Sequence, residues 1–354
     1  MSTAIGLINL RSDTQTLPTE AMRRAMAEAE LGDETYGEDP TVERLEQMAA
    51  ERLGTEAALL VISGTMANLV SLMTHCVPGD EMFVDRDGHV VYYESGGLAG
   101  IAGVMPTYVD SERGHILPEA LAGAIRRPKV HYPRSRLVWL ENTHNRAAGS
   151  VMSLAQQRGV EAVARSHRLA VHLDGARVFN AAAAQGVAAR ELASGVDTLM
   201  IDLTKGLSCP LGALLLGPRD FIDEARFRKQ RLGGGMRQAG IIAACGIVAL
   251  ETLVDRIADD HTLARWLAER LAEIDGLVID PASVETNMLY VDVSALGSST
   301  DVVDQLHRDG VLVSDRPPGH IRIVTHLQVT YELAAEAVRR CEQASTHLGG
   351  ARSA

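Results

Sequence analysis

Two kinds of residue are scarce in this chain of 354 residues: aromatic residues make up 4%, and lysine occurs only at Lys129, Lys205 and Lys229. Because so few aromatic side chains are present, the core has to be built mainly from alanine, leucine, valine and isoleucine. All the other members of the 34 basic residues are arginines, an excess typical of a bias in base composition. Chemistry that requires a primary amine on a side chain is therefore restricted to these lysines.

Cysteine is also rare and dispersed. The four cysteines lie far apart, at positions 76, 209, 245 and 341, and form no CxxC pair. This spacing does not fit zinc or redox motifs, and a disulfide framework is not expected in so long a chain, so we predict buried free thiols. The start of the chain lacks the basic region and apolar core of a signal peptide. No apolar run approaches the roughly 20 residues that span a bilayer, and we expect a cytoplasmic protein.

The overall composition is that of an ordinary soluble globular protein, with 46% hydrophobic and 23% charged residues. Such a chain is long enough for one large domain and a smaller one. Its formal net charge of −12 argues against nucleic acid or an anionic membrane as the main partner. We therefore expect neither of them to bind.

Apolar runs typical of buried strands alternate with helical segments through most of the chain. The strand-like runs cover residues 57–62, 82–85, 136–141, 169–176, 198–204 and 211–217. This alternation predicts an α/β domain with a mostly parallel sheet and helices on both faces. In such sheets, ligands bind at the carboxyl ends of the strands.

The C-terminal part of the chain has a different pattern. A glycine-rich segment at 233–238 opens two long helical stretches, and alternating strands at 286–293 and 320–327 with a helix near 331–347 predict a small α+β unit. We therefore expect an N-terminal arm over residues 1–18, a large domain over 19–255 and a small C-terminal domain over 256–354. An arm that packs with the small domain is compatible with this division.

Lys205 and Asp174 each stand at the end of a strong apolar strand. A lysine there is costly unless it is paired or used covalently, so Lys205 is a candidate nucleophile, whereas Lys129 and Lys229 lie in charged segments typical of the surface. Asp174 is placed to keep the pyridine nitrogen of an electron-sink cofactor protonated, and Arg177 to bind a carboxylate. Each also has a structural interpretation: a lysine that reaches solvent, a helix N-cap and a surface arginine.

A possible phosphate site and two histidines complete the candidates. The segment SGTMAN (63–68) joins a strand to a helix expected over 68–76, and its hydroxyls at Ser63 and Thr65 suit a phosphate cradle or an ordinary helix cap. His89 and His144 each follow a strand, where a histidine stacks on a cofactor, acts as a general base or is simply hydrogen-bonded in a loop. His89 and Glu94 lack the remaining ligands of a zinc site, so no metal is expected.

Together these segments resemble the low-specificity L-threonine aldolases, which are pyridoxal-phosphate (PLP) enzymes of the aspartate-aminotransferase-like fold, fold type I. The resemblance extends over nearly the whole chain in the expected order, through LRSDTQT, GDETYGEDPTV, SGTMANL, LENTHN, HLDGARVFNA, TKG, GGGMRQAGI and IRIVTHL. Several of these motifs are long and specific. The resemblance implies a PLP-dependent transferase-like large domain with a mostly parallel sheet, plus a small α+β C-terminal domain.

The resemblance also implies which residues bind the cofactor. Lys205 is similar to the lysine that holds PLP as an internal Schiff base, Asp174 to the partner of its pyridine nitrogen, and His89 to the histidine stacked on its ring. The further residues that the resemblance assigns to the cofactor are Gly64, Thr65, Arg177 and, reaching a phosphate from a neighbouring subunit, Arg237.

The substrate site follows from the same resemblance. Ser12, Arg177 and Arg322 resemble the group that binds the substrate carboxylate, and His144 resembles a second active-site histidine near the substrate hydroxyl. His89 is the favoured acceptor of the hydroxyl proton, with His144 or a bound water as alternatives.

The chain departs from the family pattern around the same residues. Thr204 precedes the lysine where serine is common, and Ser208 and Cys209 alter the packing behind it. Gly88 stands before the histidine where alanine is common, and Gln328 replaces the usual aspartate after THL. None of these changes removes a reactive group, but they bear on the preferred substrate.

The function that the resemblance implies is retro-aldol cleavage of L-threonine, L-allo-threonine or related β-hydroxy-α-amino acids to glycine and an aldehyde. Two alternatives stay open: another PLP-dependent lyase or transferase, acting by β-elimination or hydroxymethyl transfer, and a non-catalytic amino-acid-binding protein. A nicotinamide dehydrogenase is disfavoured because no GxGxxG follows an early strand. An Arg237 that acts across subunits implies at least a dimer, and the family suggests a homotetramer built as a dimer of dimers.

Overall fold

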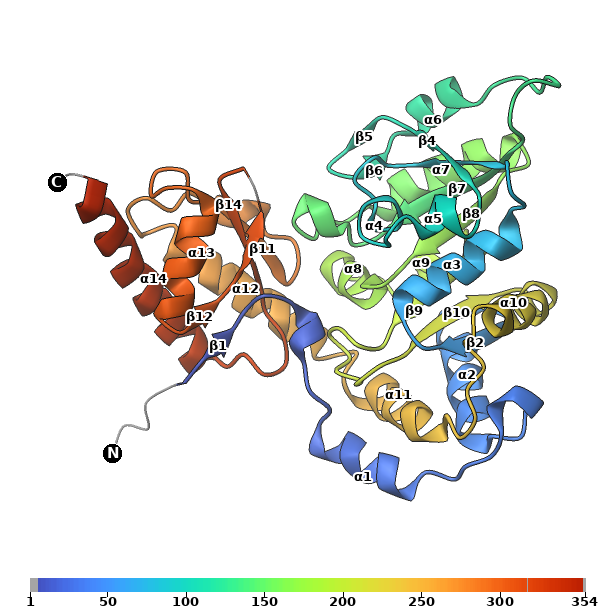
Figure 1. Ribbon diagram of the computed structural model, residues 1–354, viewed down its shortest axis with the longest axis horizontal. Helices are drawn as coiled ribbons and strands as arrows, with labels where there is room; N and C mark the ends of the chain where they lie inside the picture. The colour runs from blue at the N-terminus through green and yellow to red at the C-terminus, as the bar shows by residue number, and fades with distance from the viewer. Residues whose placement is uncertain (1–5, 317, 353–354) are drawn as a thin grey trace. The chain divides into compact units, whose positions relative to one another are not determined.

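The structure, a computed structural model, describes residues 6–316 and 318–352. These residues form two compact units, drawn in Figure 1. The larger unit is continuous from Pro18 to Val254, and the smaller unit combines the residues up to Leu17 with those from Asp255 onward. Within the described ranges, no helix is long and apolar enough to cross a membrane.

In the part of the chain that the structure describes, a seven-stranded sheet forms the centre of the larger unit (Figure 1). The pairs from β9 to β4 are parallel, whereas β10 runs antiparallel to both of its neighbours. The predicted mostly parallel α/β sheet is thus confirmed, with the run at 211–217 as its antiparallel strand. In spatial order the strands are β2 (Ala57–Val61), β10 (Ala213–Gly217), β9 (Thr198–Asp202), β8 (Ala170–Asp174), β7 (Ser135–Glu141), β3 (Glu81–Val84) and β4 (Met105–Tyr108).

Local sequence signals account for both ends of α2 (Pro40–Leu53) and for the start of α7 (Leu154–Ser166). In α2, the Asp39 carboxylate accepts the first free amides, Pro40 occupies the first turn, and Gly54 ends the helix in the left-handed conformation. In α7, Ser153 and Gln156 form a reciprocal capping box. The longer helices are α1 (Glu20–Glu28), α2 (Pro40–Leu53), α3 (Gly64–His75), α7 (Leu154–Ser166), α8 (Val178–Gln185), α10 (Arg219–Arg231) and α11 (Gly240–Thr252).

Acidic residues close three neighbouring strands at one edge of the sheet. Strand β7 ends at Glu141, β8 at Asp174 and β9 at Asp202. Glu141 and Asp174 are also partners in the register of the two strands. Because the carboxyl ends of parallel strands meet at the same edge, these carboxylates gather at the position where α/β sheets bind ligands.

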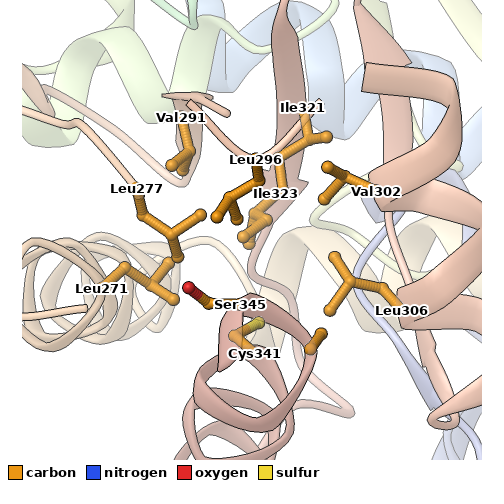
Figure 2. A pocket seen from close by; sticks show the side chains of 11 residues that line it. Leu271, Leu277, Val291, Leu296, Val302, Leu306, Ile321, Ile323, Cys341 and Ser345 are labelled. Atoms are coloured by element: carbon orange, nitrogen blue, oxygen red, sulfur yellow. The ribbon is translucent and has the colours of Figure 1, made fainter. Parts of the chain in front are cut away.

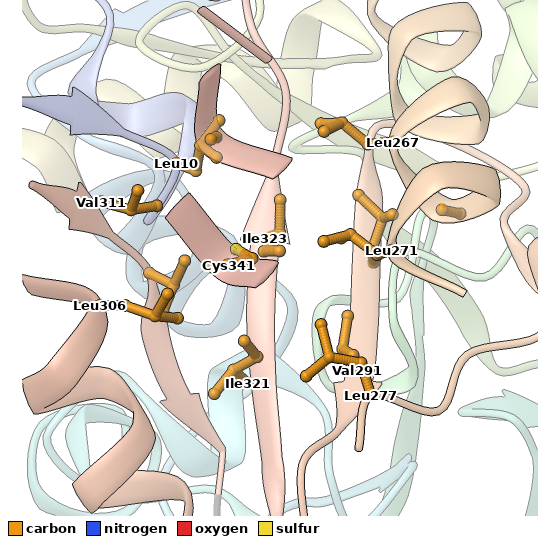
Figure 3. Packing of buried hydrophobic residues seen from close by; sticks show 14 of the residues in the cluster. Leu10, Leu267, Leu271, Leu277, Val291, Leu306, Val311, Ile321, Ile323 and Cys341 are labelled. Atoms are coloured by element: carbon orange, nitrogen blue, oxygen red, sulfur yellow. The ribbon is translucent and has the colours of Figure 1, made fainter. Parts of the chain in front are cut away.

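The smaller unit has its own sheet and its own core. Strands β11 (Met288–Asp292), β14 (His320–Val324) and β13 (Ser314–Arg316) form an antiparallel sheet, and β1 (Ile8–Asn9) pairs in parallel with β12 (Val311–Leu312). The helices are α12 (Ile257–Leu271), α13 (Ser299–Arg308) and α14 (Tyr331–Arg352). Figure 3 shows how Leu10 from the N-terminal arm packs beside Ile323 and Leu267 in this core.

A small void lies inside the same core. Its lining is almost entirely aliphatic, as Figure 2 shows, and its volume is about 10 Å³. That space is no larger than a single water molecule. The void is therefore a packing defect of the smaller unit and offers no room for a substrate.

The two lysines that the sequence placed at the surface differ from each other. Lys129 is exposed, as predicted. The prediction for Lys229 is wrong, because its side chain is only 3% exposed and its Nζ lies 2.5 Å from Oε1 of Glu34. Glu34 comes from the GDETYGEDP loop, which is distant in sequence, so the charged neighbours of Lys229 on α10 gave no sign of this burial.

Candidate active site

Lys205 lies in the connection between β9 and β10, just beyond the sheet edge. Its side chain is 13% exposed, and its Nζ is 2.9 Å from Oδ2 of Asp202. Burial raises the pKa of the Asp202 carboxyl, but the Lys205 charge and hydrogen bonds from Thr204 outweigh burial and lower this pKa overall. The Leu203 amide donates to the Gly212 carbonyl, and the Cys209 amide donates to the Leu203 carbonyl. These backbone hydrogen bonds fix both ends of the connection.

Asp174, at the end of β8, is 2% exposed. Its Oδ2 accepts a hydrogen bond of 2.8 Å from Nδ2 of Asn68, and its Oδ1 accepts one of 3.1 Å from the Ala176 amide. Burial and the nearby Glu141 raise the pKa of the Asp174 carboxyl, opposed by the charges of His89 and Lys205. A buried carboxylate of this kind is well placed to pair with a protonated ring nitrogen.

A chain of hydrogen bonds links Asp174 to His89. Asn68 donates to Asp174 and also to Oε1 of Glu94, at 2.7 Å, and the same oxygen lies 2.8 Å from Nδ1 of His89. Burial lowers the pKa of His89, but the Glu94 hydrogen bond and the charges of Asp174, Glu94 and Glu141 outweigh it, so this pKa is raised. One ligand atom from each of His89, Glu94 and Asp174 lies within 4.8 Å of the others.

His144 belongs to a second group at the same sheet edge. Its Nε2 lies 3.1 Å from Oδ2 of Asp85, and its Nδ1 accepts a hydrogen bond of 3.2 Å from the Ala147 amide. Burial lowers the pKa of His144, but Glu141 and Asp85 outweigh it and raise this pKa. Glu141 connects the two histidines, because it accepts from the His89 amide at 2.7 Å and lies 3.8 Å from Nε2 of His144.

The segment predicted as a phosphate cradle lies at the start of α3, which begins at Gly64 rather than at residue 68. Ser63 is the N-cap, and its Oγ accepts from the Met66 amide at 3.2 Å. A Cβ on Gly64 would lie 2.8 Å from Met200 Cε and 3.0 Å from Asp202 Oδ2, so a larger residue here would have to displace the Met200 side chain. The first amides of a helix have no partner within the helix and bind anions, and Gly64 lies close to the Asp202 carboxylate that pairs with Lys205.

The predicted arginines fall in different places. Arg177 is buried as the residue before α8 in the larger unit. Arg237 is 63% exposed, and its Nη1 lies 3.3 Å from Oδ2 of Asp33. In the smaller unit, the Nη2 of Arg322 donates to the Arg11 carbonyl at 3.0 Å. Arg322 is therefore bonded to the residue directly before Ser12.

Sequence reasoning missed the partners of the candidate residues. Asn68, Asp85 and Glu141 were not singled out, Glu94 was considered only as a metal ligand, and Asp202 was not singled out either. One signal was present in the sequence, because Glu141 and Asp202 end apolar strands just as Asp174 does. Asp85 likewise ends the apolar run 82–85, and Glu94 is only five residues from His89, whereas Asn68 reaches Asp174 from a distant segment and has no local sign in the sequence.

The side chains at this edge fit PLP. A partly buried primary amine on Lys205, a buried carboxylate on Asp174, the ring of His89 and the first helix amides at Gly64 and Thr65 match an aldehyde, a pyridine nitrogen, a flat ring and a phosphate in turn. All of these residues lie in the larger unit.

Comparisons with known proteins agree with this chemistry. A family model described as beta-eliminating lyase matches residues 9–294. Low-specificity L-threonine aldolase 1 of Arabidopsis thaliana is 42% identical over 329 residues, covering 91% of this chain and 92% of that protein. The low specificity L-threonine aldolase of Escherichia coli (strain K12) is 41% identical, covering 93% of this chain and 97% of that protein.

Solved structures agree with the fold. A threonine aldolase of Leishmania major superposes with a TM-score of 0.80 at 18% identity, covering 96% of this chain and 99% of that one. A structure of SPT with PLP superposes with a TM-score of 0.76 at 18% identity, covering 97% of this chain and 88% of that one. The expected fold type I is thereby confirmed. The chain belongs to the beta-eliminating lyase family and, within it, to the low-specificity L-threonine aldolases.

Proposed function

We propose that this protein is a PLP-dependent lyase that cleaves L-threonine, L-allo-threonine or related β-hydroxy-α-amino acids to glycine and an aldehyde. The observation that carries the proposal is the grouping of Lys205, Asp174 and His89 at one sheet edge, in a chain 42% identical to an L-threonine aldolase. The charges of Lys205 and His89 both lower the pKa of the Asp174 carboxyl, so the three side chains lie near one another.

When bound, PLP supplies an electron sink for the pair released as the Cα–Cβ bond of the substrate breaks. The protein's part is to hold this group and orient the substrate. Lys205 provides the amine for covalent attachment, Asp174 keeps a proton on the ring nitrogen, and the amides of Gly64 and Thr65 bind the phosphate. Asn68 fixes the Asp174 carboxylate by its 2.8 Å hydrogen bond.

His89 is the proposed acceptor of the proton on the substrate β-hydroxyl. Its Nδ1 faces the Glu94 carboxylate at 2.8 Å, so Nδ1 carries the proton and Nε2 keeps its lone pair. Among the described residues, no hydrogen bond occupies that Nε2. Both nitrogens of His144 are engaged, by Asp85 and by the Ala147 amide, which favours a positioning role for His144 beside the substrate.

Arg177, the residue before α8 in the larger unit, is the proposed ligand of the substrate carboxylate, and the assignment of Ser12 and Arg322 to that carboxylate stays a prediction. Arginine binds carboxylates through two parallel hydrogen bonds, which fixes orientation as well as position. Orientation decides the reaction here, because only the bond at Cα that stands perpendicular to the cofactor ring is weakened by the ring. A carboxylate held near the plane of the ring leaves another bond of Cα perpendicular to it. The proposed orientation puts the Cα–Cβ bond in that position.

We further propose a homo-oligomer, a dimer of dimers, in which Arg237 reaches a cofactor phosphate of a neighbouring subunit. Support comes from its 63% exposed side chain, whose Nη1 contacts both carboxylate oxygens of Asp33, at 3.3 and 3.4 Å. Tyr36 and Phe227 are also exposed: Tyr36 follows Thr35, whose hydroxyl donates to the Met236 carbonyl, and Phe227 lines a pocket together with Thr35 and Gly235. For the cell compartment we propose the cytoplasm, in agreement with four buried free cysteines.

The products decide between this function and its rivals. Purified protein supplied with PLP is assayed on L-threonine, L-allo-threonine, phenylserine and serine for glycine and aldehyde, and for ammonia and keto acid. Glycine and acetaldehyde in equal amounts from threonine are expected. Ammonia with a keto acid would instead establish an eliminase. Substrate binding without any turnover would establish an amino-acid-binding protein.

A further inference from the structure

A short hairpin packs directly on His144, and no motif in the sequence pointed to it. The hairpin consists of β5 (Ser111–Glu112) and β6 (His115–Ile116), joined through Gly114. Gly114 has a φ of +83°, and a Cβ added to it would lie 2.3 Å from Cγ of His144 and 2.5 Å from its Nδ1. The glycine backbone therefore lies flat against the imidazole, in a space that a larger residue would overlap.

The hairpin also holds the hydrogen-bond partner of His144. The Ser111 hydroxyl donates to Oδ1 of Asp85 at 2.5 Å, while the other oxygen of Asp85 faces Nε2 of His144 at 3.1 Å. On the opposite side, Ser150 donates to the Arg113 carbonyl at 2.8 Å and its own carbonyl accepts from the His144 amide at 3.0 Å. The hairpin is thus connected to His144 in two ways, through the Asp85 carboxylate and through the His144 backbone.

His115 supplies a third contact. It is 4% exposed, and its ring meets the His144 ring edge to face, with 6.2 Å between centroids and 86° between planes. Within the described residues, neither ring nitrogen of His115 has a hydrogen-bond partner. Burial, and then the charges of His144 and Arg113, lower the pKa of His115 to about 4, so the ring is neutral near pH 7.

We propose that the β5–β6 hairpin is the positioning element of His144, with Ser111 fixing Asp85 and His115 fixing the imidazole ring. Together with the Ala147 amide at Nδ1, these contacts hold the ring in one orientation, with its Nε2–H directed to Asp85. The proposal deepens the function above, because it assumes that His144 stands beside the substrate. His115 acts through His144 and is a positioning residue.

The first test measures steady-state rates of the holoenzyme on L-threonine. His115→Ala is expected to lower kcat about 10-fold, since a small displacement of an oriented group is costly to the rate, while PLP absorbance and thermal unfolding stay as in the wild type. His115→Phe keeps a ring of similar shape and is expected to restore kcat to within about twofold. Glu112→Ala, an exposed residue of the same hairpin, is the matched control.

The second test asks whether His115 acts through His144. In a His144→Ala background, His115→Ala is expected to change kcat by less than about twofold, because residues that act as a unit are not additive. Full multiplication of the two effects would overturn the proposal, as would a His115→Phe variant as slow as His115→Ala.

A third measurement does not depend on turnover. Selectively labelled imidazole resonances of His144 in the holoenzyme are expected to shift in His115→Ala and Ser111→Ala but not in Glu112→Ala. Unchanged resonances in the first two variants would refute the positioning role even if the wild type proved to have a different activity. Shifted resonances without glycine production from threonine would instead leave the positioning role standing and refute the proposed reaction.

Discussion

Two buried amine–carboxylate pairs in the larger unit invite comparison. Lys205 faces Asp202 at 2.9 Å, and Lys229 faces Glu34 at 2.5 Å. The Lys229 pair borders another complete pair, Arg226 with Glu46, so its charges are balanced locally. Burial lowers the pKa of Lys229, with the Glu34 hydrogen bond and charge opposing it. Burial and pairing are thus common to both lysines and do not by themselves identify a reactive amine.

The surroundings of Lys205 differ in what remains to be paired. Beside it lie the raised-pKa carboxyl of Asp174 and the free amides at the start of α3. These are the groups that we propose to bind a ring nitrogen and a phosphate, and the described partners of Lys229 are not part of that proposal. Whether a lysine is reactive therefore depends on the groups around it, and substitutions at Lys205, Asp174, Glu94 and Lys229 test this difference one group at a time.

Lys205→Ala is expected to have the largest effect. Without the amine, cleavage of L-threonine should fall by more than about 1,000-fold, and borohydride should no longer fix PLP to the protein. Lys129→Ala, which removes an exposed lysine, is the control and should behave as the wild type. Borohydride-fixed PLP in the Lys205→Ala protein would show that another amine holds the cofactor.

Asp174→Asn is expected to come next. The amide keeps the shape of the side chain but not its charge, so the ring nitrogen loses its partner and kcat should fall by about 100- to 1,000-fold. Absorbance of the purified protein checks that PLP is still present. A variant that kept more than a tenth of the wild-type kcat would remove Asp174 from the proposed mechanism.

Glu94→Gln tests the pairing of His89 through pH. A proton acceptor works only when it is neutral, so activity falls as the pH drops below the pKa of His89, which Glu94 helps to raise. Glutamine carries no charge, and the pKa of His89 should drop with it. The acid limb of kcat/KM is expected to move down by roughly one pH unit. A limb that stays in place or moves up would exclude His89 as the acceptor.

Lys229→Met is expected to change activity least. Glu34 would lose its nearer cationic partner but keep Arg226 at 4.0 Å and the Met236 amide at 3.3 Å, so the free energy of unfolding should decrease by about 1–3 kcal/mol, while kcat per folded molecule stays within about twofold of the wild type. Denaturant unfolding measures the first quantity and active-site titration with PLP the second. If the double variant with Glu34→Met did not regain stability, the buried charge would not be the cause.

Most of the fold could be predicted from the sequence, because its strands are continuous apolar runs. The start of α3 was placed four residues late, since Ser63, Gly64 and Thr65 are poor helix formers whose contribution is the cap itself. The antiparallel direction of β10 had no local signal, because strand direction depends on how the connection before it folds.

In the candidate site, only residues that stand in recognisable sequence motifs could be predicted. Lys205, Asp174 and His89 stand in recognisable segments, whereas Glu94 and Asn68 become meaningful only when α3 is brought beside β8. Lys229 shows the opposite failure: a charged segment indicated the surface, and a loop from the other end of the unit covered it.

The antiparallel β10 has a consequence for changing this protein. Because the chain returns from β9 straight into the sheet, with Leu203 bonded to Gly212 at 3.1 Å, the segment that carries Lys205 has both ends fixed. Inserting or deleting a single residue there would shift the lysine or break the pairing of a central strand. Variation in length should therefore be directed to exposed loops, and this segment should be altered only by substitution.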